Sequence, residues 1–126
     1  MKTIKQSYLI NAQVSKVWQA LVNPKIIDEW GGGPAKMSER EGSSFSLWGG
    51  DIHGSNLKVI KNKQLVQDWY SGDWENSSKV TFTLKSDGQK TEVDLLHEEV
   101  PDDEADEIED GWQRFYLGPL KDYLEK

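Results

Sequence analysis

The chain has two histidines, His53 and His97, and histidine is the side chain most often used for metal binding and for proton transfer near neutral pH. A zinc site needs three or four ligands, and no His-x-x-His or acid–His spacing supplies them here. His97 alternates with Val93 and Leu95 on one face of a predicted strand, which favours a hydrogen-bonded, partly buried ring. A polar contact to a ligand and a catalytic base are the alternatives for His97. His53, near a predicted turn, is interpreted as structural or exposed.

Other catalytic signatures are missing from the sequence. Nucleophilic catalysis needs a serine or cysteine beside a base, and the chain has no Gly-x-Ser-x-Gly turn and no cysteine. It has no Gly-x-Gly-x-x-Gly and no phosphate loop, and Gly31–Gly33 precede a proline rather than a helix, which favours a flexible connection. A carboxylate pair stays an alternative because acids are abundant. The sequence therefore predicts a protein that binds rather than catalyses, with no cofactor and no metal.

Tryptophan is unusually frequent, with six in 126 residues. Large aromatic rings line ligand pockets and interfaces as well as cores. Trp69 and Trp74 lie five residues apart, and with Trp30 and Trp48 they are predicted to form an aromatic patch. Core packing is the alternative for any one of them but accounts less well for all six together.

The net charge of −7 comes from one stretch of the chain. Residues 98–110 carry nine acids and no base, and the rest of the chain is nearly neutral. A nucleic-acid surface needs clustered Lys and Arg, so no nucleic-acid partner is expected. The acidic stretch is interpreted as a solvated helix start. Its alternative role is to meet a basic surface on a partner protein.

The length and apolar content fit one domain over residues 1–126. No apolar run reaches the length of a signal peptide or the ~20 residues of a membrane span. The absence of cysteine suits a reducing compartment. We therefore expect a cytoplasmic domain without membrane insertion, and the sequence leaves its oligomeric state open.

The elements that position these residues begin with a strand over Ile4–Ile10. An amphipathic helix follows, with Asn11 as its cap or a start two residues later, and it ends at Asn23–Pro24. Its buried stripe is predicted to be Val14, Val17, Trp18, Leu21 and Val22. A second, short helix then reaches Trp30.

From Met37 to Glu98 the apolar pattern has period two, which predicts five or six consecutive strands. Asp87–Gly88 predicts a tight hairpin between the last two. The residues predicted to share a strand face are Phe45 with Leu47; His53 with Ser55, Leu57 and Val59; Leu65 with Gln67 and Trp69; Val80 with Phe82 and Leu84; and Val93 with Leu95 and His97.

A long final helix is predicted after Pro101, capped by Asp102 or Asp103, with a kink or break at Gly118–Pro119. Strands in a run with helices grouped at the ends indicate an α+β fold, and this helix is the only long amphipathic element that can cover the sheet. Aromatic side chains on both surfaces predict a cavity between helix and sheet, with a solid aromatic core as the alternative. The apolar face of the helix is predicted to be Ala105, Ile108, Trp112, Phe115, Tyr116 and Tyr123.

Six segments in order resemble the family of domains related to the activator of the heat-shock protein 90 ATPase. They cover essentially the whole chain, and the last is the most specific. The segments are Val17–Leu21 with Ile27–Trp30, Arg40–Phe45, Asp51–Gly54, Trp69–Trp74, Thr91–Pro101 and Gly111–Tyr116. Ser43 stands where a second glycine is common in the family. The resemblance implies a helix-grip, START-like fold, in which a curved antiparallel sheet wraps around the long C-terminal helix and two short helices follow the first strand.

The superfamily implies an apolar cavity that holds lipids, hormones or polyketides, so binding of a small apolar molecule is the leading expectation. The predicted pocket residues are Trp30, Phe45, Trp69, Phe82, Leu95, His97, Trp112, Phe115 and Tyr116. A cyclase- or hydrolase-type enzyme, also found in the superfamily, is the least favoured alternative.

The second expectation is a protein-interaction module that regulates the heat-shock protein 90 chaperone. Eukaryotic activators of this family have a separate N-terminal domain that contributes much of the stimulation, and this chain has no room for it, which favours a stand-alone, bacterial-type member. The predicted partner-binding residues are Trp74, Asp102, Asp103, Glu104 and Glu107.

Overall fold

The structure is a computed structural model that describes residues 1–72 and 74–126. Asp73, inside the Trp69–Trp74 segment noted above, lies outside the described residues. The strands are β1 (Lys2–Ile10), β2 (Ser44–Leu47), β3 (Ile52–Ile60), β4 (Gln64–Ser71), β5 (Ser78–Asp87) and β6 (Lys90–Val100). The helical elements are α1 (Val14–Val22), α2 (Pro24–Trp30), the short 3₁₀ turns η1 (Trp48–Gly50) and η2 (Asp102–Glu104), α3 (Ala105–Gly111), the π-helical η3 (Trp112–Leu117) and α4 (Gly118–Leu124).

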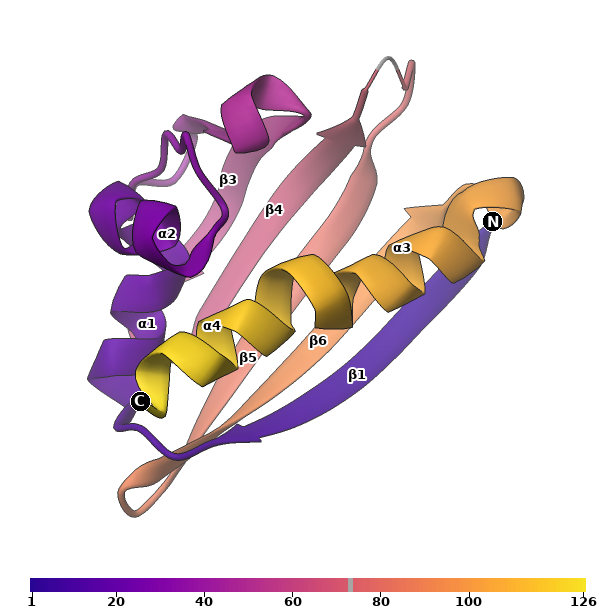
Figure 1. Ribbon diagram of the computed structural model, residues 1–126. Helices are drawn as coiled ribbons and strands as arrows, with labels where there is room; N and C mark the ends of the chain where they lie inside the picture. The colour runs from indigo at the N-terminus through magenta and orange to yellow at the C-terminus, as the bar shows by residue number, and fades with distance from the viewer. Residues whose placement is uncertain (73) are drawn as a thin grey trace.

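The described strands form one antiparallel sheet in the order β1-β6-β5-β4-β3-β2, so the first strand pairs with the last. The sheet is curved, and the helical segment from η2 to α4 lies across one face of it (Figure 1). The helices α1 and α2 contact each other and α4 at the C-terminal end of that segment. This arrangement confirms the predicted α+β, helix-grip fold.

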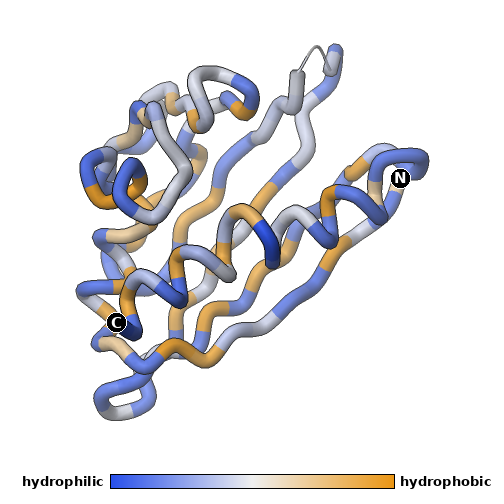
Figure 2. The backbone as a smooth tube through the Cα atoms, viewed as in Figure 1, coloured by the Kyte–Doolittle hydropathy of each residue, from blue (hydrophilic) through white to orange (hydrophobic). Residues whose placement is uncertain are grey.

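The core lies between the sheet and the long helical segment. Val80, Phe82 and Leu84 of β5 are buried, and Phe82 pairs with Leu95 on β6 while Val80 pairs with His97. Apolar and polar residues alternate along these strands, as the tube in Figure 2 shows. Period-two patterning therefore predicted the inward faces of β5 and β6 correctly.

The first helix buries four of the five residues of its predicted stripe and leaves Val14 half-buried, and its start differs from the first prediction. It begins after Gln13, and the side chain of Asn11 does not cap it, in agreement with the alternative start two residues later. At the other end, the Asn23 side chain accepts a hydrogen bond from the Lys25 amide and thereby caps α2, with Pro24 in the first helical position. Asn23–Pro24 thus ends one helix and starts the next.

In β3 the predicted face is wrong at His53, Ser55 and Leu57 and right only at Val59. Ile52 and Asn56 take inward positions instead, so Asn56 is buried and Leu57 is 49% exposed. A bulge between Asn56 and Lys58 then shifts the register, and Val59 packs against the core as predicted. The Asn56 amide donates to the carbonyl oxygens of Ser38 and Arg40. These bonds replace the hydration that a buried amide loses, which explains why a polar residue takes the inward position.

The final helix differs from the prediction in its cap and in its phase. Asp102 and Asp103 do not cap it; Asp102 instead pairs with the ammonium group of Met1 at 2.8 Å. The helix does not break at Gly118–Pro119, where the backbone keeps helical dihedral angles. The irregularity is instead the π-helical stretch Trp112–Leu117 just before these residues. The wider turn rotates Phe115 out of the core to 60% exposure, so its predicted inward position is wrong.

Candidate functional site

An aromatic cluster joins the helical segment to the sheet. Trp112 stacks on Trp69 with ring centroids 4.7 Å apart and meets Phe82 edge-on at 5.7 Å. Tyr116, one turn later, lies 4.8 Å from both Trp112 and Trp30. Such tilted and edge-to-face contacts stabilise aromatic pairs by about 0.5–1.5 kcal/mol beyond their burial. The rings therefore form a packed layer under this part of the helix.

Each of the six tryptophans donates its indole N–H to a defined acceptor. This pairing satisfies the one polar group of each ring and fixes its orientation. The acceptors are Glu39 for Trp18, the Ala20 carbonyl for Trp30, the Gly31 carbonyl for Trp48, Gln67 for Trp69, Glu104 for Trp74 and His97 for Trp112.

His97 forms the centre of a buried hydrogen-bond chain. Its Nδ1 lies 3.0 Å from the Trp112 indole nitrogen, which can only donate, so Nδ1 must accept. Nε2 therefore carries the proton of the neutral ring and donates to the Ser78 hydroxyl at 2.8 Å. The hydroxyl in turn donates to the carbonyl of Trp69 at 3.1 Å. Both ring nitrogens are thus occupied by protein groups.

Burial lowers the pKa of His97 from its usual 6.5 to about 4. A second proton would sit on Nδ1 and face the indole N–H of Trp112, so that two donors would meet. The ring is 1% exposed. His97 is therefore a neutral, structural side chain at physiological pH.

An open groove of about 670 Å³ lies beside this cluster, between the helical segment and the adjoining ends of β3 and β4. Its walls come from residues far apart in sequence. The lining residues are Trp48, Asp51, Ile52, Trp69, Ser71, Glu104, Glu107, Ile108, Asp110, Gly111, Trp112, Arg114, Phe115 and Tyr116. Most of the lining surface is apolar.

Trp48 takes its place in the groove through an unusual backbone. Its φ is 50°, and Gly49 and Gly50 continue with φ of 70° and 107°. A bulky residue rarely occupies this left-handed region, which costs about 1–2 kcal/mol. The indole donates to the Gly31 carbonyl at 2.8 Å, and its ring meets Tyr116 edge-on at 6.1 Å. These contacts hold the ring at the edge of the aromatic cluster.

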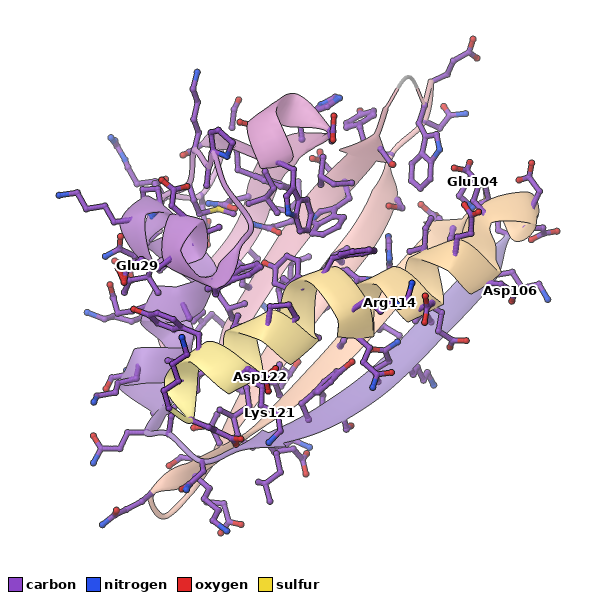
Figure 3. The ribbon with its side chains drawn as sticks, in the orientation of Figure 1. Glu29, Glu104, Asp106, Arg114, Lys121 and Asp122 are labelled. Atoms are coloured by element: carbon purple, nitrogen blue, oxygen red, sulfur yellow. The ribbon has the colours of Figure 1, made fainter. Side chains whose placement is uncertain are left out.

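The rim of the groove is acidic. Glu104 and Glu107 come from the start of the helical segment, and Asp51 comes from the turn before β3. Asp110 also lines the groove and pairs with Arg114 at 3.5 Å. Figure 3 shows Glu104 near the start of the helical segment and Arg114 farther along it.

The chain was compared with known protein families and proteins. Residues 11–125 match the model of the family described as Activator of Hsp90 ATPase homolog 1-like protein. The chain belongs to this family. It is 29% identical over 123 residues to a protein of Dictyostelium discoideum named Activator of 90 kDa heat shock protein ATPase homolog, covering 95% of this chain and 32% of that protein. The chain spans about a third of the length of the curated relatives it matches.

Two solved structures have the same fold. An HSP90 activator from Plasmodium falciparum superposes with a TM-score of 0.92 at 20% identity, covering 98% of this chain and 96% of that one. The Aha1 dimer from Colwellia psychrerythraea superposes with a TM-score of 0.81 at 26% identity, covering 99% and 97%. The first likeness, at its low identity, shows the fold alone.

In this family member the predicted pocket residues divide into two groups. Trp69, Trp112, Phe115 and Tyr116 line the groove. The other five are buried in the core and do not line it: Trp30, Phe45, Phe82, Leu95 and His97. The groove therefore lies beside the C-terminal helical segment. The predicted cavity, in contrast, lay between that segment and the sheet. A ligand-binding role for either group stays a prediction.

The residues predicted to contact a partner protein also divide. Glu104 and Glu107 line the groove, and Trp74 donates to Glu104 at 2.9 Å from the β4–β5 connection. Asp102 pairs with the N-terminus, and Asp103 is exposed outside the groove.

Sequence reasoning gave no site role to Asp51, Ile52 or Arg114. The only signal for the first two was their position after a double glycine, in a segment that resembles the family. Within residues 1–72 and 74–126, no three His, Cys, Asp or Glu side chains are grouped so that they could hold a metal ion. No described helix is both long enough and apolar enough to cross a membrane.

Proposed function

We propose that this chain is a non-catalytic binding domain that holds a small apolar molecule in the groove beside its C-terminal helical segment. The observation that carries the proposal is the groove itself, with a volume of about 670 Å³ and a lining surface that is mostly apolar. Sites for small molecules are typically concave, mostly apolar and about 300–1,000 Å³ in volume.

The exposure of Phe115 supports this proposal. A phenyl ring that is 60% exposed on a helix is costly to hydrate, and here it lines the groove beside Trp48 and Ile108. An apolar ligand in the groove would remove part of this surface from water, which stabilises binding by about 25 cal/mol per Å². The π-helical stretch directs the ring toward the groove, and such stretches occur frequently at functional sites.

The state of the titratable groups favours binding over catalysis. Both nitrogens of His97 are engaged with Trp112 and Ser78, so the ring has no free atom for proton transfer to a ligand. The Tyr116 hydroxyl is buried, and burial raises its pKa far above the usual value. Neither group has the near-neutral pKa that general acid–base catalysis needs.

The test is titration with N-phenylnaphthylamine, a neutral apolar dye whose fluorescence rises in apolar surroundings. We expect the dye to bind, and the indole N–H signals of Trp48 and Trp69 in NMR spectra to shift more than that of Trp18. Phe115→Ser should weaken binding several-fold, while the control Leu9→Ser, a residue 50% exposed on β1, should not. Dye binding that is equal in both variants would contradict this location.

A second candidate function is regulation of an Hsp90-type chaperone. The observations that favour it are the names of the relatives and the acidic stretch of residues 98–110, in which Glu104 accepts a hydrogen bond from Trp74. The measurement is a pull-down with the chaperone of the same organism at low salt, where charge contacts are strongest. Glu104→Gln combined with Trp74→Phe should reduce capture, and the control Glu92→Gln, an acid on β6, should not. Capture that is equal in all three proteins would argue against this surface.

A further inference from the structure

The charges around the groove point to the class of its ligand. Asp51, Glu104, Glu107 and Asp110 line it, and Arg114 is the one cation that lines it within residues 1–72 and 74–126. Arg114 is within 3.5 Å of Asp110, so this pair is locally neutral. Among the described residues, the other three carboxylates have no basic partner within 4 Å. The groove therefore carries uncompensated negative charge.

Asp51 shows that the negative charge of the groove does not come from the acidic helix start alone. Glu104 and Glu107 belong to the acidic stretch of residues 98–110. The charge of that stretch is explained by solvation of the helix start and does not require a ligand. Asp51 lies more than fifty residues earlier, in the turn that follows the strained Trp48. Negative charge thus reaches the groove from both of its walls. A ligand between these walls meets carboxylates on two sides.

The aromatic walls add a second attraction for a cation. Trp48 and Phe115 line the same groove with part of their rings exposed, and the face of an aromatic ring attracts a cation within about 6 Å of its centroid. This attraction amounts to about 0.5–2 kcal/mol, the upper end applying when water is excluded. An anionic ligand would instead face repulsion from the carboxylates.

We propose that the groove selects small molecules that join an apolar or aromatic body to a positively charged ammonium group. This inference rests on the proposed function, because it assigns a ligand class to the same groove. The apolar body would lie against Trp48 and Phe115, and the ammonium group would lie among Asp51, Glu104 and Glu107.

Three probes with one ring system test the charge preference: naphthylmethyl-trimethylammonium, naphthylmethanol and naphthylacetate. Their affinities are measured from the indole N–H shifts of Trp48 and Trp69. We expect the cation to bind about tenfold more tightly than the alcohol at low ionic strength, and the anion to bind most weakly. The preference should shrink as salt is raised, because salt screens exposed charges.

The variant Asp51→Asn with Glu107→Gln should remove most of the preference for the cation while leaving the affinity for naphthylmethanol unchanged. Both residues are exposed, so the fold should tolerate the changes. The matched control, Asp103→Asn with Asp106→Asn, removes the same charge from exposed acids outside the groove. Figure 3 shows Glu104 and Asp106 on opposite sides of the helical segment.

The outcomes separate the two proposals. If cation and alcohol bind the wild type equally, the ligand class is wrong and the proposed function stands. If the control variant loses the preference as fully as the groove variant, the effect comes from net charge, and the ligand class is again wrong. If none of the probes shifts the signals of Trp48 and Trp69 at millimolar concentration, the proposed function fails as well.

Discussion

The indole nitrogen of Trp112 donates to Nδ1 of His97 at 3.0 Å, and this contact fixes both the tautomer and the charge of the histidine. The donor comes from the helical segment and the acceptor from β6. The hydrogen bond therefore joins the two layers of the fold through a group that can titrate, which makes the packing of the helix sensitive to acid.

Stability should fall as the pH drops from about 6.5 to about 4. In this interval the unfolded chain binds a proton at His97 and the folded protein does not, so acid favours unfolding. The full loss is on the order of 3 kcal/mol. Urea unfolding at several pH values measures it, and His97→Gln should flatten the curve relative to wild type. The control His53→Ala should keep the wild-type slope; the same slope in His97→Gln would disprove the assignment.

Trp112→Phe should raise the pKa of His97 toward its usual value. The substitution removes the donor that faces Nδ1, so a second proton no longer meets an N–H group. NMR titration of the histidine ring signals measures the change. The control Trp18→Phe removes an indole that bonds to Glu39 elsewhere, and the pKa of His97 should stay low. A low pKa in Trp112→Phe would show that burial alone sets the value.

Gly118→Ala should destabilise the protein by several kcal/mol. A Cβ at this position would lie 1.9 Å from the carbonyl oxygen of Gln113, so the π-helical turn cannot keep its shape. The matched control is Gly111→Ala, whose Cβ meets nothing closer than the Phe115 ring at 3.8 Å. Gly111→Ala should raise stability by about 0.5–1 kcal/mol through the better helix propensity of alanine. Thermal unfolding compares the two, and similar values would refute the role given to Gly118.

Tyr116→Phe should leave stability unchanged or slightly increased. Among the described residues no group hydrogen-bonds to the buried Tyr116 hydroxyl, so its removal relieves a desolvation cost of about 1–3 kcal/mol. Tyr8→Phe is the contrasting variant, because the Tyr8 hydroxyl bonds to Gln6 and its loss should cost about 1 kcal/mol. Chemical denaturation measures the free energy of unfolding of both variants. A larger loss of stability in Tyr116→Phe than in Tyr8→Phe would indicate a hydrogen-bond partner for the Tyr116 hydroxyl.

Where period-two or helical spacing was unbroken, sequence alone predicted the fold well. The inward faces of β5 and β6 and the stripe on α1 follow directly from alternation and from the 3.6-residue turn. The hairpin at Asp87–Gly88 was signalled by its turn residues, and Gly88 has the positive φ that such turns need. These features depend on neighbours in sequence.

The candidate site was harder to predict because it depends on two breaks in regular spacing. The left-handed backbone at Trp48 interrupts the strand pattern where its ring lines the groove, and the π-helical stretch turns Phe115 outward. Neither break has a reliable signature in a single sequence. The opposition of Asp51 to Glu107 depends on tertiary packing, since the two lie on different walls of the groove.

The π-helical stretch also bears on how this groove can vary among proteins. A π turn is equivalent to one residue inserted in an α-helix, so deleting a single residue between Trp112 and Leu117 would restore regular α-helical spacing. The buried positions on either side of the deletion would stay in phase with the sheet, while the surface beside them would lose its projecting phenyl ring. The insertion or deletion of one residue is therefore a route by which related proteins could gain or lose the groove while keeping the same core.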